Sequence, residues 1–318
     1  MKNILAIIAI CTLSFGGAFA QQDPLLSHYM FNGLFINPAY AGSHPYTGAT
    51  LVHRNQWIGF GDGRPKTSVF GIDGPIKNKT MGLGFTFVND NTGGFKRNDI
   101  LLNYAYHLKV NEKGTLSLGI SAGMVNLGYD NSKTQGWNQG GKLEAINDVA
   151  FTNGGFWTPK IGFGAYYYTK KFYAGVSLPT LYAKESNEFS YTANPNDFNY
   201  FKTQVLLTAG YVFDIGGDIM LKPSTLIKYQ KNVPLQVDLN CNAFFRNGLS
   251  TGLSFRTDKT SSWLVALLGY NVSPELRMGF GYDFNFSSIR KYNSGSLELM
   301  LGYDFGSRIV KVRNPRYF

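Results

Sequence analysis

Apolar and polar residues alternate with a period of two along most of this chain. Between residues 98 and 110, for example, Leu102 and Tyr104 fall on one side of the alternation, whereas Asn103 and His107 fall on the other. This pattern is typical of β-strands that bury one face. It predicts about fourteen strands, at residues 47–57, 66–76, 80–90, 98–110, 115–128, 157–169, 171–181, 201–213, 219–230, 234–246, 249–257, 262–272, 275–287 and 295–305.

The expected strands are about ten residues long, which is the length that a tilted strand needs to cross a bilayer. Their connections alternate in length. Short turns are expected at residues 77–79, 111–114, near 170, 214–218, 246–248 and 273–274. Long loops are expected at residues 58–65, 91–97, 129–156 and 182–200. We therefore predict an all-β fold, a transmembrane antiparallel β-barrel of about fourteen strands with both termini in the periplasm. A soluble sandwich or propeller is the alternative, but it explains neither the strand length nor the alternating loops.

The first twenty residues resemble an export signal. Lys2 precedes an apolar run over residues 4–13, and Ala18-Phe19-Ala20 fits a small-x-small cleavage site,. We expect a signal peptide at 1–20, an N-terminal periplasmic or plug segment at 21–46, the barrel at 47–305 and a basic periplasmic tail at 306–318. Cys241 would be the only cysteine left after cleavage, so an intramolecular disulfide is excluded.

The formal net charge of +10 does not indicate nucleic-acid binding. Four of the basic residues, Arg308, Lys311, Arg313 and Arg316, lie in the tail, and an exported chain without a basic aromatic groove is a poor partner for nucleic acid,. Attraction to a partner protein or an anionic surface polymer fits better. The scattered histidines show no metal-ligand spacing, and no cofactor is expected.

A catalytic site would need a serine, a histidine and an orienting group within hydrogen-bond reach. His53 and His107 are the strand histidines, and His107 shares its inferred inward face with Asn103, while Ser117 and Ser121 point inward on the next strand. Any polar lumen supplies such an inventory, so we expect no enzyme. An outer-membrane lipid hydrolase remains the alternative that these residues would serve.

The long loop at 129–156 carries Trp137 and ends beside Trp157, and its polar stretch at 142–148 is expected to form a helical turn. Exposed tryptophan, asparagine and glycine suit a surface that contacts a protein or a glycan. An ordinary loop packed on the barrel mouth explains them equally well.

Two terminal motifs identify a family. The start contains Gln22-Asp23-Pro24, then Tyr29-Met30-Phe31-Asn32, then Asn37-Pro38-Ala39-Tyr40-Ala41-Gly42-Ser43, and later Gln56-Trp57. The end contains Gly302-Tyr303-Asp304-Phe305 and Pro315-Arg316-Tyr317-Phe318. This chain strongly resembles the PorP/SprF family, which are outer-membrane proteins of the type IX secretion and gliding motility systems of the Bacteroidota. Gly33 departs from the family pattern, in which a proline is expected.

The resemblance implies a barrel of the cell outer membrane without enzymatic activity. Its expected partners are a secreted adhesin with a C-terminal sorting domain, or the periplasmic ring lipoprotein with its associated secretion subunits. A diffusion porin or small-molecule channel is the alternative function.

The N-terminal motif is rich in apolar residues that must be buried somewhere. We expect it to fold into the barrel as a plug, with docking on a periplasmic partner as the alternative. The residues that we assign to this plug or partner-binding role are Tyr29, Met30, Phe31, Asn32, Asn37, Pro38, Tyr40, Gly42 and Trp57. The tail residues that we expect to bind a partner are Arg313, Pro315, Arg316, Tyr317 and Phe318. Trp137 and Trp157 are the candidate surface contacts of the loops.

Overall fold

The computed structural model describes residues 24–306, apart from a few internal stretches. Those stretches are residues 62, 131–134, 138–142, 146–153, 184–202, 232, 260, 288–289 and 292, and the backbone alone is described at 135–137, 143–145 and 154. None of the helices in this part of the chain is long and apolar enough to cross a membrane.

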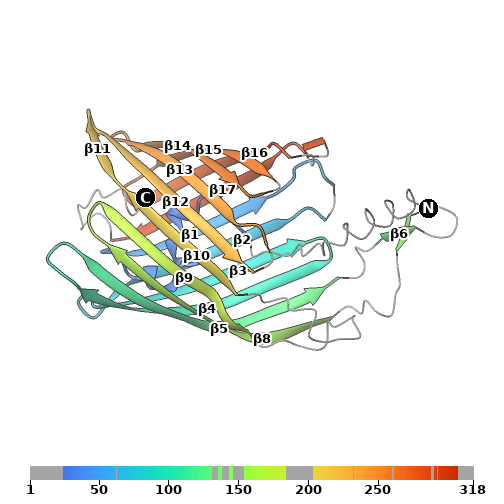
Figure 1. Ribbon diagram of the computed structural model, residues 1–318, viewed down its shortest axis with the longest axis horizontal. Coiled ribbons are helices and arrows are strands. Elements are labelled where there is room, and N and C mark those ends of the chain that lie inside the picture. The colour runs from blue at the N-terminus through green and yellow to red at the C-terminus, as the bar shows by residue number, and fades with distance from the viewer. Residues whose placement is uncertain are drawn as a thin grey trace, which may run out of the picture.

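The fold is a closed antiparallel β-barrel of fourteen strands (Figure 1). Its strands are β1 (Thr47–Asn55), β2 (Lys66–Ile76), β3 (Met81–Thr92), β4 (Phe95–Lys109), β5 (Thr115–Tyr129), β8 (Gly154–Tyr168), β9 (Phe172–Ala183), β10 (Gln204–Tyr211) continued by β11 (Phe213–Gly216), β12 (Ile219–Gln230), β13 (Gln236–Phe245), β14 (Leu249–Thr257), β15 (Ser262–Asn271), β16 (Leu276–Asn285) and β17 (Ser296–Phe305). A separate two-stranded ladder joins β6 (Gln135–Trp137) to β7 (Leu143–Ala145).

The barrel closes where the first strand meets the last. Thr47 pairs with Phe305 and Asn55 pairs with Leu297, so β1 and β17 are joined along their full length. Both ends of the barrel domain therefore lie at one rim. The connections at that rim are two to five residues long, the first at residues 77–80 and the last at residues 272–275. We call this rim the short-turn end. The opposite rim, the long-loop end, carries residues 56–65, 130–153 and 184–203.

The fourteen predicted strands are confirmed, but three connections differ from expectation. Residues 91–97 do not form a long loop, because Thr92 pairs with Phe95 around Gly93, whose φ of 60° permits a tight turn,. The expected turn at 214–218 shortens, since β11 continues to Gly216. The helical turn expected at 142–148 is wrong, because residues 143–145 form strand β7.

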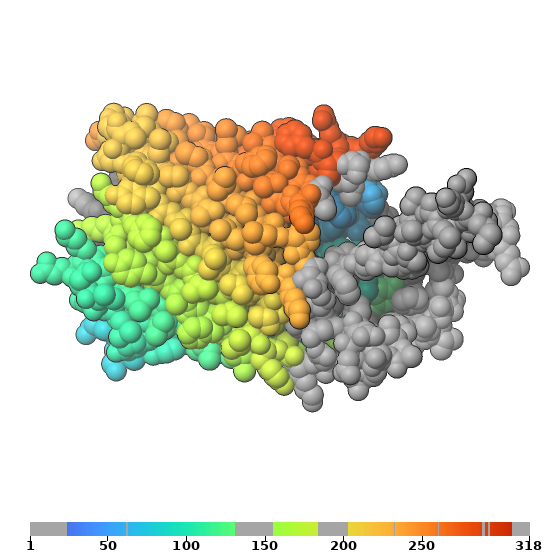
Figure 2. Space-filling model, viewed as in Figure 1, coloured from blue at the N-terminus to red at the C-terminus, as the bar shows by residue number. Residues whose placement is uncertain are grey.

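The alternation of the sequence places apolar residues outside and polar residues inside. Leu102 is 67% exposed and Leu253 is 59% exposed on the outer surface, whereas their neighbours Asn103 and Ser254 are buried in the lumen. Figure 2 shows that one face of this outer wall is continuous across the yellow and orange strands. An apolar exterior around a polar interior is the arrangement that a barrel needs in a bilayer.

Three short helices lie inside the ring of strands (Figure 1). They are η1 (Tyr29–Phe31), α2 (Gly33–Ile36) and η2 (Pro38–Tyr40). The sequence Asn37-Pro38 starts η2 because the Asn37 side chain accepts a hydrogen bond from the N–H of Ala39, and proline suits the first helical position,.

The outward position of Leu102 makes a direct test of the membrane-facing surface. Leu102→Arg should lower the free energy of unfolding by about 2–4 kcal/mol, because it places a charge in the hydrocarbon region. Val110 lies just beyond the end of β4 and is 59% exposed, so Val110→Arg should cost only about 0–1 kcal/mol. Urea unfolding in liposomes measures both variants. Equal losses of stability in the two variants would contradict the placement of Leu102 in the hydrocarbon region and of Val110 at its edge.

Candidate functional site

The N-terminal segment, residues 24–46, occupies the lumen of the barrel. None of its residues is classed as exposed, and Leu26, Ser27 and His28 are almost completely buried. It begins beside Arg97 and Lys160, near the long-loop end, and reaches the short-turn end where β1 starts. The segment therefore runs along the barrel axis before the first strand.

Apolar contacts hold the segment against the inner wall. Tyr29, Met30 and Ile36 pack with inward residues of β10, β12 and β15. Leu26 packs against Val52, among others, on the side of the wall that includes β1. These apolar wall positions interrupt an otherwise polar lumen, which explains how the segment buries its own apolar side chains.

A cluster of charges, which we call the ionic anchor, holds the start of the segment. It consists of Arg54, Asp238, Arg256, Asp283 and Glu298, from five different strands. The carboxylate of Glu298 accepts hydrogen bonds from the backbone N–H groups of Ser27 (2.7 Å) and His28 (2.6 Å). It also pairs with His28 Nδ1 (2.7 Å) and Arg54 (3.1 Å).

The other members of the ionic anchor also bind the segment. The hydroxyl of Ser27 donates to Asp283 and accepts from Arg54, which also pairs with Asp283. Arg256 pairs with Asp238 at 2.8 Å and donates to the carbonyl of Leu26 at 3.3 Å. Charges that would be costly if buried alone are thus paired with each other and with the segment backbone.

Asn37 fixes the middle of the segment to β8 and β9. Its side-chain amide donates to the carbonyls of Ala165 (3.0 Å) and Val176 (3.2 Å). The hydroxyl of Ser177 donates to the carbonyl of Ile36 at 2.6 Å. Backbone groups of the segment and the wall are therefore satisfied by side chains rather than by strand pairing.

Asp73 of β2 holds the end of the segment. Its carboxylate accepts the N–H of Gly42 at 2.8 Å and pairs with Nε2 of His44 at 2.9 Å. Gly42 has a φ of 66°, and a Cβ there would lie 2.6 Å from Cα of Gly82. Glycine is required at 42 for both reasons.

Glycines of the wall make room for the segment. A Cβ at Gly82 would overlap the carbonyl of Ala41, one at Gly119 would overlap the backbone of Ala39, and one at Gly164 would overlap the side chain of Asn37. Gly33, the departure from the family pattern, has its own physical reason. A Cβ at Gly33 would overlap the ring of Tyr40.

Two titratable groups of the segment have shifted pKa values. Burial would lower the pKa of His44, but the adjacent carboxylate of Asp73 outweighs it and the pKa is raised,. Burial, supported by the charge of Asp238, raises the pKa of Tyr29 well above its ordinary value. The hydroxyl of Tyr29 accepts a hydrogen bond from Asn240. Tyr29 is therefore a neutral structural residue.

The predicted site residues of the first motif lie together. Tyr29, Met30, Asn32, Asn37 and Pro38 are buried in the lumen, Phe31 and Tyr40 are half-buried there, and Gly42 meets Asp73. Trp57 lies elsewhere, in the loop after β1, where its backbone N–H donates to the hydroxyl of Ser296 (3.3 Å) and its ring packs on Phe60.

The other predicted contact residues are only partly described. Trp157 is a strand residue of β8 that is 53% exposed. Trp137 lies in β6, where only the backbone is described. Arg313, Pro315, Arg316, Tyr317 and Phe318 lie outside the described residues.

The catalytic inventory does not assemble into a triad. His107, Asn103, Ser117 and Ser121 all face the lumen, as their alternation predicts, and His107 lies opposite Ser117. Within the described part of the chain, however, the hydroxyl of Ser117 has no hydrogen-bond partner, while Asn103 donates to Thr86. No group of three potential metal ligands occurs among the described residues either.

The closed barrel, its apolar exterior and its polar lumen define an outer-membrane β-barrel protein. The family model of the type IX secretion system membrane protein PorP/SprF matches residues 18–303. This chain belongs to the PorP/SprF family, and its location is the cell outer membrane.

Solved structures with the same architecture include two hydrocarbon channels. The CymD monoaromatic hydrocarbon channel is 14% identical, with a TM-score of 0.50 and coverage of 86% of this chain and 92% of that chain. A TodX channel mutant is 9% identical, with a TM-score of 0.50 and coverage of 86% and 94%. These likenesses show the fold alone. No curated protein matches the chain.

The ionic anchor has no motif of its own in the sequence. Arg54, Asp238, Arg256, Asp283 and Glu298 all occupy inward positions of the alternation, so a search for inward charges would have found the candidates. The pairing between them depends on strand register, which alternation does not give.

The ionic anchor predicts a large effect of a single neutralisation. Glu298→Gln should lower the free energy of unfolding by about 3 kcal/mol, because Arg54 and His28 lose a buried carboxylate. The control is Asp218→Asn, whose exposed carboxylate pairs with Arg246 in a turn and should leave stability unchanged. Urea unfolding measures both. Similar losses of stability in Glu298→Gln and Asp218→Asn would show that the ionic anchor does not stabilise the fold.

His44 predicts a pH-dependent stability. Because its folded pKa is raised above 6.5, protonated His44 contributes stability that is complete below about pH 6.5 and lost as the pH rises through the folded pKa. The wild-type protein should therefore exceed His44→Gln in stability by more at about pH 5 than at about pH 9. Unfolding curves at both pH values test this. The same difference in stability at both pH values would show that protonation of His44 beside Asp73 does not stabilise the fold.

Proposed function

We propose that this barrel serves the type IX secretion system by holding partner proteins rather than by conducting solutes. The observation that carries the proposal is the N-terminal segment, whose residues lie buried in the lumen and are anchored to seven strands or more by side-chain contacts. A barrel built around such a segment offers its two rims and loops as binding surfaces.

The partner at the cell surface is a large secreted adhesin with a C-terminal sorting domain. The barrel assists its export or holds it at the surface. The long-loop end, with Trp137 in β6 and the exposed Trp157 in β8, is the side that we assign to this contact. The loops there are the longest in the barrel, and binding surfaces are commonly built on such loops.

The partner in the periplasm is the ring lipoprotein of the secretion machine with its associated subunits. We assign it to the short-turn end, where both the N-terminal segment and β17 meet the rim. The tail residues Arg313, Pro315, Arg316, Tyr317 and Phe318 are the docking residues in this proposal. A role as adhesin-specific helper and a role as core subunit use the same barrel and differ only in which partner is bound.

A diffusion porin is the competing function, and the two solved hydrocarbon channels fit its architecture. A porin needs an open lumen lined by charged residues. The charges of the ionic anchor are instead paired with one another and with Ser27 and His28, which favours a closed barrel. His107 and Ser117 form no hydrogen bond with each other, so they give no support to a lipid hydrolase.

Purification of the tagged barrel from its native outer membrane in mild detergent tests the proposal. Recovery of an adhesin would identify a helper, and recovery of ring subunits would identify a core component. Recovery of the barrel alone would contradict both.

The tail can be tested in the same experiment. Arg313→Ala combined with Arg316→Ala should reduce the recovery of the periplasmic partner while the barrel remains folded, because two charges of the docking segment are lost. The control is Lys259→Ala, an exposed lysine in the turn between β14 and β15 at the opposite rim, which should leave recovery unchanged. Equal recovery from all three proteins would exclude the tail as the docking element.

A further inference from the structure

Exposed lysines gather on one half of the short-turn end. They lie in or directly beside the turns of three hairpins, β2–β3, β4–β5 and β8–β9. Glu112 is the only acidic residue in the same stretches, 77–80, 109–114 and 169–171. The lysines, which we call the lysine arc, are Lys77, Lys79, Lys109, Lys113, Lys170 and Lys171.

The three hairpins are neighbours in the barrel wall. Strand β3 pairs with β4, and β5 pairs with β8. At the rim, Thr115 pairs with Lys109 on one side and with Tyr168 on the other. The N–H of His107 donates to the carbonyl of Thr80 at 2.9 Å. The turns therefore follow one another along the rim, and those of β4–β5 and β8–β9 lie together on the left of Figure 1.

Most of these charges are not compensated by a carboxylate of the described chain. The exposed ion pairs there join Lys96 to Asp130 and Arg246 to Asp218 instead. Lys170 already has a partner and is not counted. The remaining five lysines of the arc create a positive potential along the rim, which attracts an anionic partner.

The first turn presents its lysines at a conformational cost. Lys77, Asn78 and Lys79 have φ angles of 46°, 57° and 66°, in the left-handed region that glycine and asparagine tolerate better than lysine. The N–H of Lys79 donates to the carbonyl of Ile76 at 3.1 Å, which holds the turn. Lysines kept where glycine would cost less indicate a role for their side chains.

Each turn also places an exposed apolar residue next to a lysine. The outward apolar residues mark the edge of the hydrocarbon band. The headgroup layer beyond it is about 5–8 Å deep, and one or two residues of strand span about 3–7 Å. The ammonium groups therefore reach the depth of the lipid phosphates. The pairs are Ile76 with Lys77, Val110 with Lys109, and Phe172 with Lys171.

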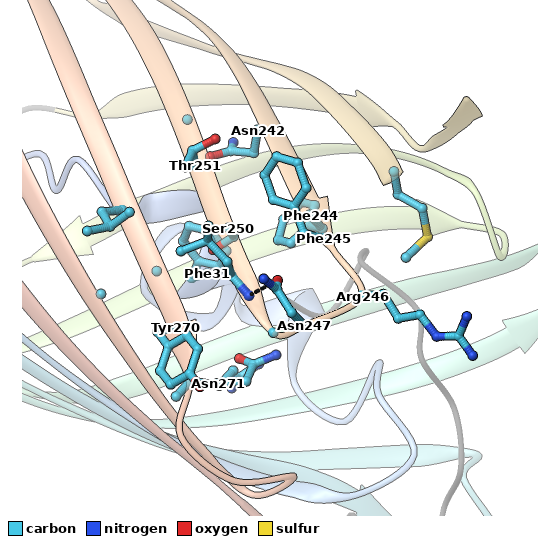
Figure 3. Close-up of a pocket in the computed structure, with 18 of the residues that line it drawn as sticks. Phe31, Asn242, Phe244, Phe245, Arg246, Asn247, Ser250, Thr251, Tyr270 and Asn271 are labelled. Atoms are coloured by element: carbon cyan, nitrogen blue, oxygen red, sulfur yellow. Dashed lines mark hydrogen bonds between the residues drawn. The ribbon is translucent and has the colours of Figure 1, made fainter. Parts of the chain in front are cut away.

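The other half of the same rim has a different character. Its turns, at residues 217–218, 246–248 and 272–275, contain no lysine. Figure 3 shows Arg246 and Asn247 of the β13–β14 turn, and Arg246 pairs with Asp218 at 2.9 Å. Asp214 and Glu275 add negative charge on this half. The basic character is thus confined to one side of the barrel.

We propose that the lysine arc binds the phosphate headgroups of anionic phospholipids and holds a patch of them against one side of the barrel. The short turns of outer-membrane barrels face the periplasm, so these are lipids of the inner leaflet. Lysine binds phosphate as a compact point charge. An acidic protein surface has the same sign of charge, but the depth of the arc beside the hydrocarbon edge favours lipid.

Native mass spectrometry of the purified full-length barrel in mild detergent tests the proposal. The wild-type protein should bind phosphatidylglycerol more tightly than phosphatidylcholine with the same acyl chains. Lys77→Gln combined with Lys109→Gln and Lys171→Gln should lower the affinity for phosphatidylglycerol about tenfold or more, because each lysine near an anionic headgroup contributes about fivefold. The affinity for phosphatidylcholine should not change.

A matched control removes the same number of charges from the long-loop end. Lys66→Gln combined with Lys231→Gln and Lys259→Gln changes three exposed lysines there and should leave phosphatidylglycerol binding at the wild-type level. Heat-modified gel migration shows that each variant is folded. Equal losses in the two triple variants, or no preference of the wild-type protein for phosphatidylglycerol, would overturn the proposal.

Photo-cross-linking locates the bound lipid. In phosphatidylcholine vesicles that contain a phosphatidylglycerol with a photoreactive headgroup, cross-links should map to residues 77–80, 109–114 and 169–171. Equal labelling of 217–218, 246–248 and 272–275 would show unselective contact and contradict the arc. A protein partner that is lost in the arc variant while phosphatidylglycerol binding persists would also overturn it. The inference uses the orientation of the barrel but not its proposed partners, so the two fail separately.

Discussion

The carboxylate of Glu298 is the point on which the structure depends. It lies on the last strand, pairs with Arg54 of the first strand, and accepts two backbone N–H groups of the N-terminal segment. One buried group thus joins barrel closure to the position of the segment. Buried charges are tolerated only when paired and hydrogen-bonded. The wall charges pair with one another, and the segment supplies further hydrogen bonds to them.

Glycines and small residues inside the barrel shape the lumen around the segment. On one side of the lumen, Gly82, Gly119 and Gly164 admit the segment backbone at contact distance. On the other side, small residues of β14 to β16 leave a chamber of about 1170 Å³ beside Phe31 (Figure 3). The lumen is therefore uneven, with the segment packed along one side and the chamber on the other side, toward the short-turn end. A porin, by contrast, has a polar lumen that forms a water-filled channel.

Alternation alone predicted the strands, their faces and the closed barrel, because each strand repeats a period-two signal over about ten residues. It failed at residues 91–97, where Gly93 permits a turn much shorter than the polarity of the stretch suggested. The burial of Tyr29 and Met30 in the lumen was expected from their hydrophobicity. The ionic anchor was not, because strand register and barrel closure bring Arg54, Asp283 and Glu298 together across hundreds of residues of chain. Trp57 belongs to the family motif, yet it lies in a loop, since sequence proximity to a motif does not place a residue in the same site.

The central claim is that the anchored N-terminal segment closes the lumen. Single-channel recording of the purified wild-type barrel in planar bilayers tests this most directly. We expect no steady conductance, because Ser27, His28 and their charged partners occupy the passage. A stable, porin-like open state in the wild-type protein would show that the segment does not seal the barrel, and it would move the function from partner holding to transport.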